Sequence, residues 1–211
     1  MTLFTEHSYS RVMVFIDYRN VQNAAKHMVD CRLDLYRLTQ VLVGNRDLVG
    51  AYIFDALYTE GDARNEPAMK EHSKLRDNGF RVIVKRDAIK VRDDGKEVQK
   101  EVDVSMACEM VEHALLNHYD VAIVVSGDMD FVPAMMKVQA AGKRVEVAAF
   151  DDFYNDKCKS VADVYYLLDD IPFMSMATEV SEVGYDDRFQ RFQETDDNRW
   201  HDQRGRHIRD R

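Results

Sequence analysis

The sequence predicts an α/β fold, a mainly parallel central sheet with helices on both faces. Two observations lead to this prediction. Short runs of β-branched and other apolar residues recur along the chain, and segments with helical spacing separate them. Strands that are apolar along their whole length are typical of a parallel sheet covered on both faces. With 211 residues, 45% of them hydrophobic, the chain is long enough for one full core.

Five apolar runs are predicted as strands, because each is short and rich in β-branched or aromatic residues. They lie at residues 11–17, 48–58, 81–86, 120–128 and 144–150. Helices are expected at residues 20–28, 33–44, 66–79, 102–118, 131–142 and 159–171. Glycines at 44, 79 and 142 are natural helix ends. Residues 87–100 are predicted as a hairpin with its turn at Asp94 and Gly95.

The predicted domain covers residues 11–172, between an N-terminal extension at 1–10 and a polar tail at 173–211. The tail is dense in both charges and nearly without aliphatic residues, so it is expected to be disordered unless a partner protein orders it. Its aromatic residues Phe189, Phe192 and Trp200 would then make the contact.

Composition limits the class of protein and its location. The three cysteines are far apart, with no C-x-x-C spacing, and no segment resembles a signal peptide or a membrane span. We therefore expect a cytoplasmic protein without membrane contact. A net charge of −9 argues against a general electrostatic attraction to nucleic acid, but not against a local basic track.

Four aspartates stand where the predicted elements meet. Asp17 ends the first strand, Asp128 and Asp130 follow the fourth, and Asp103 starts the helix after the hairpin. Ligands of parallel α/β sheets bind beyond the carboxyl ends of the strands, so these acids meet in one crevice if the first and fourth strands are neighbours. Oxygen ligands without nearby His or Cys suit Mg²⁺ or Mn²⁺ rather than zinc. Such ions can promote phosphodiester cleavage.

A structural alternative is that these acids only cap helices. Asp128 or Asp130 would then cap the helix that begins near Phe131, and Asp103 would cap its own helix. Other catalytic templates are absent from the sequence, among them G-x-x-x-x-G-K-[ST] and G-x-S-x-G.

Four stretches together resemble the NYN domain, in particular the LabA-like branch of the PIN-like nuclease superfamily. They are "FIDYRN", "KEVDVSMACEM", "IVVSGDMDFVPAMMKVQAAGKRVEV" and "SVADVYYLLDD". The resemblance runs from about residue 11 to 170. It implies a PIN-like three-layer sandwich and a nuclease, usually acting on RNA, that uses divalent metal held by acids.

The resemblance also implies roles for individual residues. Asp17, Asp103, Asp128 and Asp130 would hold the Mg²⁺ or Mn²⁺, and Asn20 would orient a carboxylate or a phosphate. Glu109 matches a further acidic position of the family, but it stands about 240° around the helix from Asp103. Tyr18 departs from the family, which commonly has Gly there, and would narrow the site or stack on a base.

A basic track for single-stranded RNA is expected beside these acids, with Tyr18 and Arg19 at its mouth and Lys85, Arg86 and Lys100 along it. A solvated face with ordinary ion pairs is the alternative. Arg19 would contact a phosphate or pair with an acid. Two rival functions stay open: a non-catalytic RNA-binding or regulatory scaffold, and a small-molecule phosphohydrolase. A homodimer is expected on base rates alone.

Overall fold

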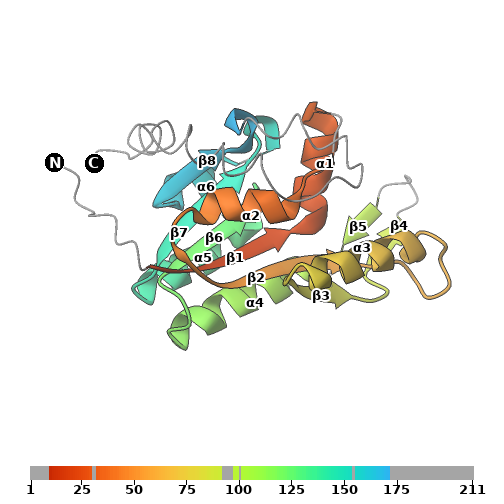
Figure 1. Ribbon diagram of the computed structural model, residues 1–211, viewed down its shortest axis with the longest axis horizontal. Coiled ribbons are helices and arrows are strands. Elements are labelled where there is room, and N and C mark those ends of the chain that lie inside the picture. Colours follow the sequence, from red (N-terminus) through yellow and green to blue (C-terminus); the bar gives the residue numbers. More distant parts are fainter. Residues whose placement is uncertain (1–9, 30–31, 92–96, 100, 154, 172–211) are drawn as a thin grey trace.

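The computed structural model in Figure 1 describes residues 10–29, 32–91, 97–99, 101–153 and 155–171. Its main sheet has six strands in the order β3-β2-β1-β6-β7-β8, and all neighbours in it are parallel. The strands are β1 (Arg11–Asp17), β2 (Asp47–Ala56), β3 (Arg81–Lys85), β6 (Val121–Val125), β7 (Arg144–Ala149) and β8 (Val164–Leu167). The predicted α/β fold with a parallel sheet is confirmed.

The helices cover both faces of this sheet. They are α1 (Tyr18–Val29), α2 (Leu35–Val43), α3 (Asn65–Asp77), α4 (Val102–Leu115), α5 (Val132–Ala140) and α6 (Asp156–Val161). Alternate residues of β1 point to opposite faces, so Val14 packs into a core with α1, α2 and α3, whereas Phe15 packs into a second core with α4 and α5. The three layers of the predicted sandwich follow from this alternation.

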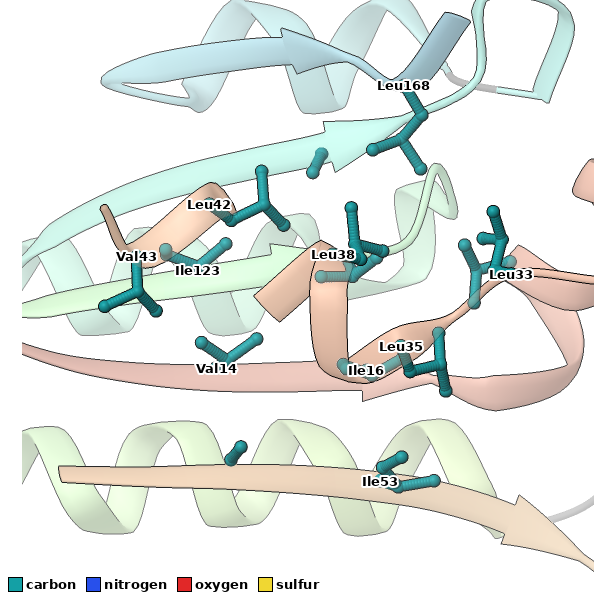
Figure 2. Packing of buried hydrophobic residues seen from close by; sticks show 14 of the residues in the cluster. Val14, Ile16, Leu33, Leu35, Leu38, Leu42, Val43, Ile53, Ile123 and Leu168 are labelled. Carbon is teal, nitrogen blue, oxygen red and sulfur yellow. The ribbon is translucent and has the colours of Figure 1, made fainter. Parts of the chain in front are cut away.

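Helix α2 seals the first core. Figure 2 shows Leu35, Leu38 and Leu42 among side chains of β1 and β6, and all of them belong to the same core. Asp34 caps the helix, because its Oδ1 accepts hydrogen bonds from the backbone N–H of Tyr36 and of Arg37, both at 3.1 Å. The helix ends at Gly44, as predicted, with a φ of 58° that disfavours a side chain.

The two central strands, β1 and β6, are neighbours, so the acids at and after their C-terminal ends lie on the same side of the sheet. β1 pairs with β6 in parallel, and Ile16 stands opposite Val125. The residues that follow, Asp17 and Ser126, therefore leave the sheet at the same carboxyl edge. This is the neighbour relation that the metal-site prediction required.

The last predicted helix is wrong. Residues 159–171 do not form one helix: α6 ends at Val161, and Val164–Leu167 form strand β8, which pairs in parallel with β7. The "VYYL" run is β-branched and aromatic, which favours a strand, and β7 offers it an unpaired edge. A short 3-10 turn at Leu168–Asp170 follows.

The predicted hairpin is present as β4 (Ile89–Val91) and β5 (Glu97–Gln99), an antiparallel pair. Its predicted turn at Asp94 and Gly95 lies outside the described residues, as do the N-terminal residues 1–9 and the tail from 172 on. Within the described part of the chain, no helix has the length and apolar character needed to cross a bilayer.

Candidate active site

Asp17 is the most buried of the four predicted acids. It is the last residue of β1, it is 5% exposed, and α1 begins at the next residue. Its Oδ1 accepts a hydrogen bond from the backbone N–H of Asn20 at 3.3 Å. Burial raises the pKa of Asp17 to about 7, against the smaller opposing effect of that N–H; the charges of Asp103, Asp128 and Asp55 raise it further. The protein thus places this carboxyl where a negative charge is unfavourable.

Asp128 and Asp130 lie on the turn that leaves β6. Asp128 Oδ1 accepts from the backbone N–H of Asp130 at 2.9 Å and so caps the 3-10 turn Met129–Phe131. The Ser126 hydroxyl accepts from the N–H of Asp128 at 3.2 Å. Asp128 is half-buried and Asp130 is exposed. Asp128 therefore caps this 3-10 turn and not the helix that follows it, since α5 has no side-chain cap. The cap leaves the carboxylate charge available for a second role.

Asp103 lies in the first turn of α4 and is half-buried. Glu101 occupies the N-cap position of α4 and makes no side-chain cap hydrogen bond, so Asp103 is not the cap of this helix. Burial raises the pKa of Asp103, and the charges of Asp128 and Asp130 raise it further. The charges of Asp103 and Asp128 also act on Asp17, so each of these acids, which come from β1, α4 and the turn after β6, is close enough to at least one other to affect its pKa.

Asn20 joins two of these elements. It stands in the first turn of α1, where its backbone N–H reaches Asp17, and its side-chain Oδ1 is 3.5 Å from the backbone N–H of Gly127, at the limit of a hydrogen bond. It therefore spans the space between the end of β1 and the turn after β6.

Glu109 does not belong to this group. Its Oε2 lies 3.3 Å from Nε2 of His113, a nitrogen that also lies 2.8 Å from the Tyr52 hydroxyl. This is another face of α4 from that of Asp103, as the helical spacing predicted.

The residues predicted to contact RNA have different surroundings. Arg19 is engaged: its Nε donates to Asp55 Oδ1 at 2.9 Å, and its Nη2 donates to the Ala56 carbonyl at 3.1 Å. The Tyr18 ring meets His72 edge-on, with centroids 6.1 Å apart, and its hydroxyl accepts from Arg32. Burial raises the pKa of Tyr18.

The remaining predicted contacts differ in exposure. Lys85 is half-buried at the end of β3 and Arg86 is exposed. Lys100 lies outside the described residues.

Sequence reasoning missed the buried pair Asp55 and His72, which are 1% and 2% exposed. His72 Nε2 lies 2.7 Å from Asp55 Oδ2. An acid inside the apolar run "AYIFDALY" was the available signal, because a carboxyl in a buried strand needs partners. Cys158 was also missed: its thiol donates to the Asp128 carbonyl at 3.2 Å and so holds the turn that carries the acids.

The donor set of the site consists of carboxylate oxygens, which suits Mg²⁺ or Mn²⁺. In the described segments, no three His, Cys, Asp or Glu side chains are already arranged as ligands of one metal ion. Mg²⁺ usually keeps several of its waters and takes only one or two carboxylates directly, so this arrangement and this chemistry are compatible.

Comparison with known proteins identifies the fold and the family. A sequence model of the NYN domain matches residues 11–169. A solved structure of a Vibrio parahaemolyticus protein of unknown function is similar, with a TM-score of 0.63 and 23% identity, over 79% of this chain and 98% of that one. At this identity the likeness shows the fold alone. No curated protein matches the sequence.

Proposed function

Because the chain belongs to the NYN domain family, which is part of the PIN-like nuclease superfamily, we propose that it is a divalent-metal-dependent nuclease that hydrolyses RNA. Within the family, the "FIDYRN" and "SGDMDF" motifs support a place in the LabA-like branch. The three scattered cysteines, without C-x-x-C spacing, support a cytoplasmic location.

One observation carries the proposal: acids from three separate elements act on one another, and burial, with the added charges of Asp103 and Asp128, raises the pKa of Asp17 to about 7. Capping accounts for Asp128 alone. A fold that crowds acids in this way is destabilised unless a cation compensates them, so a divalent ion is the simplest reason for the arrangement.

Asp17, Asp103, Asp128 and Asp130 would hold Mg²⁺ or Mn²⁺. When bound, such an ion neutralises this charge and activates a water for attack on phosphorus. The chain's own contribution is orientation. The Asn20 N–H fixes one oxygen of Asp17, and the Asp130 N–H fixes one oxygen of Asp128, so each carboxylate presents its second oxygen in a defined direction.

The substrate backbone would lie along the carboxyl edge of the sheet. Arg86 is exposed and Lys85 half-buried at the end of β3, where their charges would contact phosphates and favour a polymer over a mononucleotide. Tyr18, partly buried beside His72, would narrow the site rather than offer a free ring face.

The test compares hydrolysis of an RNA oligonucleotide, the matching DNA oligonucleotide and a mononucleotide phosphoester, each with Mg²⁺, with Mn²⁺ and with EDTA. We expect metal-dependent cleavage of the RNA only. Cleavage of the mononucleotide alone would instead support a small-molecule phosphohydrolase. RNA binding without cleavage under any metal would support the non-catalytic scaffold.

A further inference from the structure

The first turn of α1 is held in place by a partly buried ion pair between Arg19 and Asp55, neither of which is a proposed metal ligand. Arg19, the second residue of α1, donates from Nε to Asp55 Oδ1 at 2.9 Å and from Nη2 to the Ala56 carbonyl at 3.1 Å. Both acceptors lie at the carboxyl end of β2, the strand that pairs with β1. Arg19 therefore fastens α1 to the neighbouring strand.

The acceptor at the other end of this contact is itself rigid. Asp55 is 1% exposed, and its carboxylate also takes the backbone N–H of Ala56 at 2.8 Å and lies 2.7 Å from His72 Nε2. A buried carboxylate with three partners has little freedom to move. The single N–H of Arg19 Nε donates to this carboxylate, so it is not available to another anion.

The same turn of α1 sets the geometry of the acids. The backbone N–H that orients Asp17 Oδ1 belongs to Asn20, the residue after Arg19, and the Asn20 side chain approaches the N–H of Gly127 on the turn that carries Asp128. A shift of this turn would move the Asp17 contact and the Asn20 side chain together.

We infer that Arg19 is a positioning residue: through Asp55 it fixes the first turn of α1, and so the orientation of Asp17, and it is not a phosphate contact. Of the two roles that the sequence left open for Arg19, the pairing with an acid is the one observed, and we set aside the phosphate contact. It rests on the proposed metal-dependent nuclease function and concerns the same site.

The test measures the kcat, the KM for an RNA oligonucleotide, the salt dependence of RNA binding, and the Mn²⁺-induced rise in melting temperature. The variants are Arg19→Lys, Arg19→Ala, Asp55→Asn and the Arg19→Ala/Asp55→Asn double variant. Arg86→Ala is the comparison for loss of an exposed charge. Circular dichroism spectra and apo melting temperatures establish that each variant is folded.

For Arg19→Lys we expect kcat to fall on the order of 10²-fold with KM nearly unchanged, because an ammonium cannot reach both acceptors of the guanidinium fork and small displacements at an active site have effects of this size. The Mn²⁺-induced rise in melting temperature should also be smaller in this variant. The salt slope of RNA binding should stay that of the wild type. Arg19→Ala should give at least the same loss. Asp55→Asn, which keeps an accepting oxygen but removes the charge, should give a smaller one, and the double variant no more than Arg19→Ala alone.

A phosphate contact gives the opposite pattern. Arg19→Lys would then keep most activity, whereas Arg19→Ala would raise KM and lower the salt slope by about 0.7, as we expect for Arg86→Ala, and its effect would add to that of Asp55→Asn. That pattern would overturn the inference. If wild type neither cleaves RNA nor responds to Mn²⁺, the proposed function itself fails, which is a separate outcome; an unfolded Arg19→Ala leaves the decision to Arg19→Lys.

Discussion

Asp128 shows how one side chain serves two purposes. Its Oδ1 caps the 3-10 turn through the N–H of Asp130, while its charge raises the pKa of both Asp17 and Asp103. Asparagine keeps the oxygen that caps the turn and removes the charge. Comparison of Asp128→Asn, which keeps the cap, with Asp128→Ala, which removes it, therefore separates the effect of the cap from that of the charge.

For Asp128→Asn we expect an apo protein at least as stable as wild type, because the cap is kept and the repulsion with Asp17 and Asp103 is relieved. Asp128→Ala should lose about 1 kcal/mol of the cap's contribution relative to Asp128→Asn. Urea unfolding in EDTA measures both values. A clear loss of stability in Asp128→Asn would show that the charge is favourable in the apo state, contrary to the account.

The raised pKa of Asp17 predicts an unusual pH dependence of stability. The folded pKa of about 7 lies above the ordinary value of 3.8, so the folded state binds this proton more tightly than the unfolded state. The stabilisation is full below about pH 4 and is lost as the pH rises toward 7. In EDTA, wild type should lose at most roughly 4 kcal/mol from this group over that range.

Asp17→Asn should not show this loss, and its free energy of unfolding should exceed that of wild type most at pH 7.5 and above. Chemical unfolding as a function of pH, with the exposed Asp151→Asn as the control, measures the difference. If the free energy of unfolding changes with pH in the same way for wild type and Asp17→Asn, the pKa of Asp17 is not raised by burial and repulsion.

At the scale of elements, the positions of strands and helices follow from local pattern except at the C-terminal end. Five strands and the helices before residue 150 were predictable because apolar runs, caps and glycine ends agreed with one another. Residues 164–167 were not, because "VYYL" gains its strand partner only from the open edge of β7, a contact distant in sequence from the local pattern.

In the candidate site, too, some features could be predicted from the sequence and others could not. The places of Asp17, Asp128 and Asp130 after β1 and β6, and of Asp103 at the start of α4, were predictable, since parallel topology places strand ends together. Their role as metal ligands stays a prediction. The Arg19–Asp55–His72 contacts were not, because His72 reaches Asp55 from α3 and nothing in the spacing of these residues shows which side chains meet across the first core.

Helix α2 is the element whose packing is most directly testable. Leu38 on α2 is fully buried in the first core. Leu38→Ala should lower the free energy of unfolding by roughly 2–5 kcal/mol through lost burial and the cavity left behind. Guanidinium unfolding measures this loss. The kcat, measured well below the melting temperature, should be unchanged; a small stability loss with a large fall in kcat would mean that the core and the site are coupled.

At the scale of the whole molecule, the matched family domain ends at residue 169 and the described structure at 171. The sequence predicts that the polar tail adds nothing to the core, because it has almost no aliphatic residues. Deleting residues 181–211 should leave the melting temperature and RNA cleavage as they are in the full chain. A large fall in melting temperature on truncation would show that the tail packs on the domain.

If Asp17, Asp103, Asp128 and Asp130 hold a divalent ion that serves RNA hydrolysis, cleavage depends both on the metal and on these charges. The rate of RNA cleavage is followed as a function of Mn²⁺ concentration for wild type and for Asp128→Asn, after both have been treated with EDTA. The account predicts no cleavage without metal, saturable activation of wild type, and almost none of Asp128→Asn at the same concentrations. Wild-type cleavage rates in Asp128→Asn, or cleavage that does not depend on metal, would contradict it.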